Sequence, residues 1–307
     1  MPTTIAAVAP ALPPHRYAQA EVTEALAHLV APDGERDGLM RRLHASAGVR
    51  HRHLAIPLEA YAGLDTFGKA NDVFIEVGVD LGERAVRTAL DAAGLDTEDV
   101  DVVLATSVTG VAAPSLDARL VGRLGLRADV KRIPVFGLGC VAGAAGIARL
   151  HDYLVGHPDD VAVLLSVELC SLTVQRNDTS TANLVASGLF GDGAAAVVLV
   201  GERRAAAMGL TGPQVVDTRS RFYPDTERVM GWDIGGSGFR IVLSASVADV
   251  VEEHLGQDVT GFLGDHDLKV DDIGPWVAHP GGPKVLHAMA RSLGLRPGAL
   301  DRTWRSL

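Results

Sequence analysis

The residue in this sequence that could do the most direct chemistry is Cys140. It follows the apolar segment 133–136 and the two glycines Gly137 and Gly139, and an alanine-rich helix is expected to begin at it. Glycines permit a sharp turn from a strand into a helix, and the positive end of a helix favours the thiolate form of a cysteine. The pattern predicts a nucleophile, while a small buried core cysteine remains the alternative.

A nucleophilic cysteine needs an imidazole partner, and His279 is the candidate among eleven histidines. It follows the apolar stretch 275–278 and precedes the turn-forming residues 280–283, which lead into an expected helix. This order predicts a histidine at the end of a strand, facing a pocket. A capping or structural histidine is the alternative.

The other motifs point to weaker candidates. Cys170 ends an apolar segment without a glycine turn, which favours a place in a pocket wall or core over catalysis. His51 and His53 alternate along a strand-like segment, and without further ligands we expect a solvated strand there and not a metal site. Because no CxxC pair, HExxH motif or dinucleotide fingerprint is convincing, we expect no metal and no nicotinamide cofactor.

Apolar patterning predicts the elements that position these residues. Continuous apolar runs are typical of strands buried on both faces, and helical spacing of apolar residues is typical of packed helices. The expected strands are 5–8, 102–105, 133–136, 161–165 and 194–200, and the expected helices are 77–95, 116–124 and 283–293. Their alternation indicates an α/β fold with mostly parallel sheets.

The helix expected at 140–150 is unusual because its first nine residues carry no charge. A surface helix normally has a polar face. We therefore expect this helix to be buried on every side between two sheets, with close packing compensating for the low helix propensity of its glycines.

Composition narrows the class of protein. The 307 residues, 47% of them hydrophobic, suffice for two domains or one duplicated core, and the net charge of −10 argues against bulk binding to nucleic acid or anionic membranes. Two cysteines exclude a disulfide framework, and neither a membrane span nor a signal peptide is expected, so we expect a cytoplasmic protein. The polar stretch 201–209 suggests a division into domains 1–203 and 204–307.

Five ordered segments together resemble the type III polyketide synthases, the chalcone synthase family of the thiolase superfamily. They read FGLGCVAGAAGIARLHDYL, VELCSLTVQRND, SGLFGDGAAAVV, WDIGGSGFRIVL and WVAHPGGPKVL, and they cover nearly the whole chain. The resemblance implies a thiolase-like five-layer αβαβα sandwich of two similar halves, found as a homodimer. The nucleophile would lie in the first half and the histidine in the second.

The same resemblance implies roles for particular residues. Cys140 and His279 match two members of a Cys–His–Asn catalytic set, and Phe190 and Phe239 match gatekeepers between a coenzyme A tunnel and the reaction cavity. Further matches are Thr109, Thr173 and Met230 as cavity-lining residues, Ala113 near the dimer interface and Arg42 as a contact of coenzyme A phosphates. Leu39 and Ser46 stand at two other phosphate positions, where Arg41, Arg50 and Arg52 are candidate substitutes.

The implied reaction loads Cys140 with an acyl group from acyl-CoA and extends it by decarboxylative condensation of malonyl-CoA or methylmalonyl-CoA. Two segments look most like those of bacterial alkylresorcinol and alkylpyrone synthases, so we expect a long-chain fatty starter and cyclisation to such a product. The small residues 235–238 before Phe239 would leave room for an alkyl tail, and Met230 would trim the cavity. Coenzyme A thioesters are expected as substrates, without any further cofactor or metal.

One member of the catalytic set is not found. The family's asparagine would fall just past Leu307, so we expect the sandwich to lack its C-terminal strands. Two alternatives stay open at this point: a ketoacyl-acyl carrier protein synthase III-like condensing enzyme, and a naturally truncated, inactive interaction partner.

Overall fold

The computed structural model describes residues 2–307, which form two compact units built from interleaved chain segments. Unit 1 contains the residues up to Tyr17 together with Arg52–Thr173 and Gly191–Thr218. Unit 2 contains Ala18–His51, Val174–Phe190 and Arg219–Leu307. The division into 1–203 and 204–307 stays a prediction.

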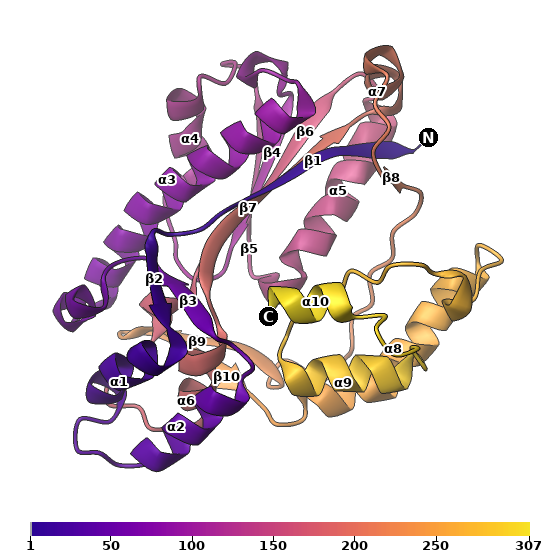
Figure 1. Ribbon diagram of the computed structural model, residues 1–307. Helices are drawn as coiled ribbons and strands as arrows, with labels where there is room; N and C mark the ends of the chain where they lie inside the picture. The colour runs from indigo at the N-terminus through magenta and orange to yellow at the C-terminus, as the bar shows by residue number, and fades with distance from the viewer. Residues whose placement is uncertain (1) are drawn as a thin grey trace. The chain divides into compact units, whose positions relative to one another are not determined.

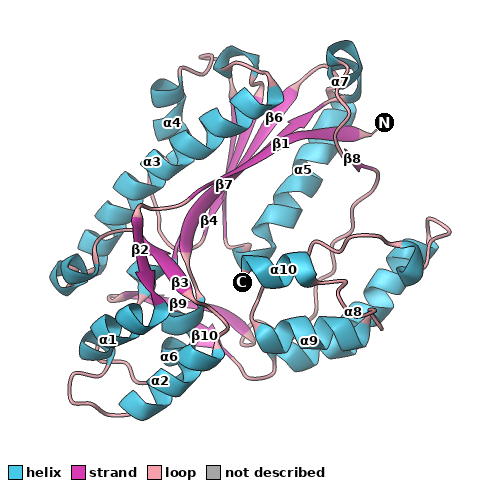
Figure 2. Cartoon of the chain, in the orientation of Figure 1, coloured by secondary structure: helices cyan, strands magenta, loops and turns pink. Residues whose placement is uncertain are grey.

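A six-stranded sheet forms the centre of unit 1 (Figures 1 and 2). Its strands, in the order β5-β4-β6-β7-β1-β8, are Lys131–Phe136, Val102–Ser107, Val161–Leu169, Asp192–Val200, Thr3–Ala11 and Gln214–Val215. All five strands expected from apolar runs are present. The expectation of mostly parallel pairing is wrong: β4 runs parallel to β5 and β6, but β7 is antiparallel to both β6 and β1. Apolar runs report burial on both faces and not strand direction.

Helices cover both faces of this sheet (Figure 1). They are α3 (Phe67–Ala93), α4 (Leu116–Leu124), α5 (Ala142–Gly156) and the short α7 (Glu202–Met208). Leu164 and Leu165 are neighbours in β6 and therefore point to opposite faces, Leu164 toward Gly146 of α5 and Leu165 toward Gly82 of α3. Small residues on both helices thus let them approach the sheet closely.

Unit 2 is mainly helical. Its helices are α1 (Gln19–Val30), α2 (Asp37–Ser46), α6 (Thr181–Leu189), α8 (Val247–Gly264), α9 (Pro283–Ser292) and α10 (Asp301–Ser306). Strands β9 (Met230–Gly235) and β10 (Gly238–Leu243) form an antiparallel hairpin. The short strands β2 (His15–Ala18) and β3 (His51–Leu54), most of whose residues belong to unit 1, pair with each other. No helix within residues 2–307 is both long and apolar enough to cross a membrane.

Two sequence expectations about the surroundings of the catalytic candidates are wrong. Helix α5 buries only one face, on which Gly146 and Leu150 lie, while Ala144 and Arg149 are exposed. Residues 275–278 form no strand, and Val277 is 90% exposed. A strand exists only where a neighbour takes its hydrogen bonds, and apolar composition alone does not supply that neighbour.

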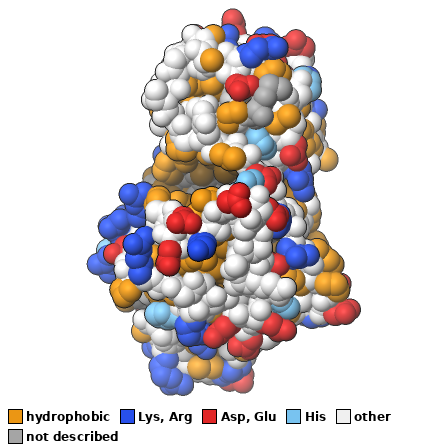
Figure 3. All heavy atoms as spheres, turned by 90° about the vertical axis from the view of Figure 1, so that its right-hand side faces the viewer, with side chains coloured by type: hydrophobic (Ala, Val, Ile, Leu, Met, Phe, Trp, Pro, Cys, Tyr) orange, Lys and Arg blue, Asp and Glu red, His pale blue; other side chains and the backbone are white. Residues whose placement is uncertain are grey.

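The surface mixes charges of both signs. Acidic and basic side chains intermingle on the face shown in Figure 3. Exposed pairs such as Arg291–Glu252, at 2.6 Å, contribute little individually to stability. The mixture accompanies a net charge of −10, and the absence of a nucleic-acid partner stays a prediction.

The close packing of α5 on the sheet can be tested by two glycine substitutions, one of which is a matched control. An alanine Cβ at Gly146 would lie 2.5 Å from Cδ1 of the buried Leu164, whereas one at Gly143 would meet nothing within 4 Å. Gly146→Ala should therefore lower the free energy of unfolding, by about 1–3 kcal/mol for overpacking. Gly143→Ala should raise it, by up to about 1 kcal/mol of helix propensity. Thermal unfolding of both variants checks this, and a stabilised Gly146→Ala would contradict the close packing.

Candidate active site

Cys140 lies where the chain turns from the edge strand β5 into helix α5. Gly137 and Gly139 adopt φ values of +99° and +59°, in the left-handed region that favours glycine. Gly139–Val141 form a single 3₁₀ turn, and α5 begins at Ala142. The glycines therefore do what the sequence suggested: they present an exposed Cys140 on a sharp bend.

The surroundings of Cys140 favour its protonated form. Lost hydration raises the pKa of the thiol, and the nearby Glu168 carboxylate raises it further. This is opposite to the effect expected from the helix N-terminus. Within unit 1 the resting cysteine is therefore a thiol at neutral pH, and a base must remove its proton before it can attack.

Glu168 holds a cluster of donors beside the cysteine, defined here as the Glu168 cluster (Glu168, Ser107, Val108 and Thr109). Its Oε2 accepts hydrogen bonds from Thr109 Oγ1 at 2.6 Å and Ser107 Oγ at 3.2 Å, and the Val108 amide donates to Oε1 at 3.1 Å. Burial raises the pKa of Glu168, although these donors favour its anion. Sequence reasoning missed this residue, whose signal is a charge inside an apolar strand.

Thr109 and Thr173, both expected to line the cavity, are buried and hydrogen-bonded in unit 1. Thr109 Oγ1 accepts from the Leu169 amide at 2.9 Å besides donating to Glu168. Thr173 Oγ1 donates to the Cys170 carbonyl at 2.8 Å. Their hydroxyls are therefore committed to the protein, and their role toward a substrate stays a prediction.

Cys170 lies deeper than Cys140. Burial raises its pKa well above the ordinary value, and the charges of Glu168 and Asp192 add to this effect. Asp192 is itself buried and accepts from the Ser171 amide at 2.8 Å and the Ala55 amide at 2.7 Å. A thiol in this position is a poor nucleophile, in agreement with the pocket-wall or core position expected from the sequence.

One proposed coenzyme A contact is wrong. Arg52 is only 3% exposed, and burial lowers its pKa while Asp192 opposes that shift. An enclosed guanidinium cannot meet a phosphate in solution. Arg42 and Arg50 are exposed, so they keep that possibility, whereas Arg41 lies 2.9 Å from Asp37 and 2.8 Å from Glu24.

His279 belongs to unit 2 and sits in a tight turn. The Gly281 amide donates to the His279 carbonyl at 2.9 Å, and Gly282 adopts φ +111° immediately before α9. The residue is exposed overall, yet partial desolvation of the ring lowers its pKa. A neutral imidazole at neutral pH is the form that can accept a proton from a thiol.

The two gatekeeper candidates are also in unit 2. Phe190 directly follows α6 and is half-buried, and its amide donates to the Ala186 carbonyl. Phe239 in β10 is 2% exposed and meets Trp232 edge-on, with ring centroids 6.0 Å apart. Gln175 Nε2 donates to the Phe239 carbonyl at 3.1 Å. Met230, at the start of β9, is 39% exposed.

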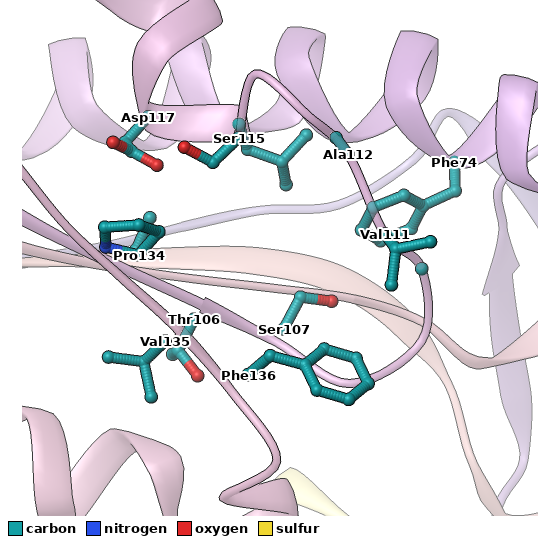
Figure 4. A pocket seen from close by; sticks show the side chains of 13 residues that line it. Phe74, Thr106, Ser107, Val111, Ala112, Ser115, Asp117, Pro134, Val135 and Phe136 are labelled. Atoms are coloured by element: carbon teal, nitrogen blue, oxygen red, sulfur yellow. The ribbon is translucent and has the colours of Figure 1, made fainter. Parts of the chain in front are cut away.

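A pocket of about 160 Å³ opens beside the edge strand of unit 1 (Figure 4). Val111 and Ala112 line it from the loop that contains Ala113, and Phe136 lines it from β5. Ser107, a member of the Glu168 cluster, also lines this pocket. Within residues 2–307 no group of three His, Cys, Asp or Glu side chains could hold a metal ion, and the lack of any cofactor stays a prediction.

The chain is similar to known proteins over almost its whole length. Residues 2–203 match the N-terminal domain of chalcone and stilbene synthases. A 1,3,6,8-tetrahydroxynaphthalene synthase of Streptomyces peucetius subsp. caesius is 62% identical over 305 residues, which are 99% of this chain and 80% of that protein. A putative chalcone synthase of Bacillus subtilis is 38% identical, over 80% of this chain and 70% of that protein.

Solved structures give the same picture. The 1,3,6,8-tetrahydroxynaphthalene synthase of Streptomyces coelicolor A3(2), described as a bacterial type III polyketide synthase, superimposes with a TM-score of 0.91 at 32% identity. The match covers 99% of this chain and 85% of that one. PKS-I of the brown alga Ectocarpus siliculosus also gives 0.91, at 26% identity over 99% of this chain and 83% of that one. The expected thiolase-like α/β fold is confirmed.

The charge of Glu168 generates a test of the cysteine's environment. Because the carboxylate raises the pKa of Cys140, Glu168→Gln should lower that pKa and move the midpoint of iodoacetamide alkylation to lower pH. Alkylation at neutral pH should then be severalfold faster, as followed by peptide mass spectrometry. Cys140→Ser identifies the labelled site, and Cys170→Ala should leave the midpoint in place. A midpoint that stays fixed or rises in Glu168→Gln would contradict this account.

Proposed function

We propose, because this chain belongs to the chalcone and stilbene synthase family of type III polyketide synthases, that it builds a polyhydroxylated aromatic product from malonyl-CoA alone. The family makes it a condensing acyltransferase that uses coenzyme A thioesters. Membership of this enzyme family argues against both alternatives from the sequence, the ketoacyl-acyl carrier protein synthase and the inactive interaction partner. The identity of the starter and the product are the parts proposed here.

Cys140 and His279 are proposed to share the first step. His279 takes the proton of the thiol, and Cys140 Sγ forms a thioester with the acyl carbon as the bond to the coenzyme A sulfur breaks. The proton then passes to the leaving coenzyme A thiolate. Their pKa shifts support these roles, since a protonated thiol and a neutral imidazole are the reactants such a transfer requires.

Extension then proceeds by decarboxylation. The bond between the malonyl carboxylate and its methylene breaks, carbon dioxide leaves, and the resulting enolate attacks the Cys140 thioester carbonyl. A hydrogen-bond donor such as His279 stabilises the enolate oxygen as charge develops on it. The sulfur of Cys140 is displaced and can then take back the lengthened chain.

The observation that carries the product class is the 62% identity to a 1,3,6,8-tetrahydroxynaphthalene synthase over 99% of this chain. The name of that compound gives its origin: hydroxyls alternate on each ring, the carbon skeleton divides into two-carbon units, and there is no alkyl tail. Such a compound follows when malonyl units provide both the starter and the extensions. The same chemistry is proposed for this chain.

A long-chain fatty acyl starter remains the second candidate from the sequence. The small residues 235–238, which were an argument for it, have another explanation. The small residues 235–238 form the turn of the β9–β10 hairpin, where Gly238 adopts φ +91°. A tight turn requires glycine for its own geometry, so these residues need no alkyl tail to explain them. The alkylresorcinol or alkylpyrone product, like the use of methylmalonyl-CoA, therefore stays a prediction.

A homodimer is proposed from the edge of the unit 1 sheet. Strand β5 ends the sheet, and its residues Ile133 and Phe136 are exposed, as are Leu138 and Val141 after it. An apolar strand edge is normally covered, because it otherwise pairs with other chains. A second copy of this chain is the occupant that the family suggests. The cytoplasmic location stays a prediction.

Product analysis tests the proposed function. The enzyme supplied with malonyl-CoA alone should give an aromatic product with the mass of a tetrahydroxynaphthalene, read by liquid chromatography and mass spectrometry. Cys140→Ala should abolish both product and acylated enzyme, and Cys170→Ala should keep activity. A product that requires added fatty acyl-CoA would establish the long-chain alternative instead, and a requirement for acyl carrier protein would overturn the substrate class.

The strand edge gives a separate test. Phe136→Asp places a charge on the exposed end of β5 and should convert a dimer into a monomer in sedimentation analysis, because burying that carboxylate at an interface is unfavourable. Val216→Asp, at a residue 75% exposed outside this edge, is the control and should stay dimeric. A dimeric Phe136→Asp protein would show that the copies associate elsewhere.

A further inference from the structure

Helix α2 of unit 2 carries Arg42 on an exposed face and His44 on a buried face. Arg42 is exposed on one face, where the family resemblance gives it the phosphates of coenzyme A. His44, two residues later, is 1% exposed and points into unit 2. A separation of two residues places side chains on nearly opposite sides of a helix. His44 therefore connects helix α2, which carries Arg42, to the residues packed inside unit 2.

The His44 ring contacts two other helices through both of its nitrogens. Nδ1 lies 2.8 Å from Thr23 Oγ1 in α1, and Nε2 lies 3.1 Å from the Leu184 carbonyl and 3.2 Å from Ser187 Oγ in α6. A carbonyl oxygen can only accept, so Nε2 carries a proton and donates to Leu184. Thr23 Oγ1, which donates to the Gln19 carbonyl at 2.7 Å, is the partner of Nδ1. The ring thereby joins α1, α2 and α6.

The sequence of α6 is fitted to this ring. A Cβ at Gly188 would lie 2.3 Å from the His44 ring, so only glycine lets the ring rest on the backbone there. The Gly188 carbonyl accepts a hydrogen bond from Gln19 Nε2 at 2.7 Å. The last turn of α6 is therefore fixed from two sides, two residues before Phe190.

We propose that His44 is a positioning residue that fixes the end of α6, and with it Phe190, against the helix that carries Arg42. The proposal rests on the proposed function and on the gatekeeper role that the family resemblance implies for Phe190. A fixed Phe190 would set how malonyl-CoA enters, whereas the thiol chemistry of Cys140 would not depend on it. His44 touches no reacting atom and acts through α6.

The test separates positioning from simple stability. His44→Leu keeps much of the ring's bulk but removes its three polar contacts, to Thr23, Leu184 and Ser187. His44→Gln restores a donor that can reach the Leu184 carbonyl. His44→Leu should raise KM for malonyl-CoA about tenfold with a smaller change in kcat, the effect expected for loss of such hydrogen bonds. His44→Gln should recover most of it. Iodoacetamide alkylation of Cys140 should be unchanged in both variants.

His151 provides the matched control. It is a buried histidine of α5 whose Nδ1 lies 2.9 Å from Thr3 Oγ1. His151→Leu should lower the thermal midpoint to a similar extent as His44→Leu but leave KM in place. Equal changes of KM in the two variants would assign the effect of His44 to stability alone and overturn the proposal.

Hydrogen exchange makes the result independent of activity. Amide exchange measured by mass spectrometry over 184–190 should be faster in His44→Leu than in the wild type and return toward it in His44→Gln. If the wild type makes no product from malonyl-CoA, the proposed function fails while exchange still decides the positioning role. Unchanged exchange in His44→Leu overturns that role whatever the activity.

Discussion

The hydrogen bonding of the half-buried Glu168 carboxylate is the interaction on which the surroundings of both cysteines in unit 1 depend. A charge at the end of a central strand is tolerated because Thr109, Ser107 and the Val108 amide all donate to it. The same contacts tie the segment after β4 to β6, the neighbouring strand in the sheet. Desolvation raises the pKa of both cysteine thiols, and the nearby Glu168 charge raises each further, so both thiols favour the protonated form.

The two cysteines, Cys140 and Cys170, differ in their exposure and in their surroundings. Cys140 stands on a bend made by two glycines with positive φ and is exposed, whereas Cys170 is only partly exposed and lies near the buried Asp192. A reagent or substrate therefore reaches the Cys140 thiol more readily. Reactivity here follows from backbone geometry and access, since the local charge disfavours both thiolates.

In unit 2 the side chains proposed to guide substrates are held by polar contacts to backbone. Gln175 binds the carbonyl of Phe239, and His44 binds the carbonyl of Leu184 near the end of α6. A hydrogen bond to a backbone carbonyl restricts the movement of that backbone segment. The backbone of Phe239 and the end of α6 that precedes Phe190 are restricted in this way.

Five strands, the glycine bend before Cys140 and the family could be predicted from the sequence, because they depend on local patterns of apolar residues, backbone freedom and motif order. Strand direction, the burial of Arg52 and the raised pKa of Cys140 emerge from the folded chain. Each of these depends on residues far away in the chain, as when Glu168 lies beside Cys140. Burial and charge act through space, so no local pattern records them.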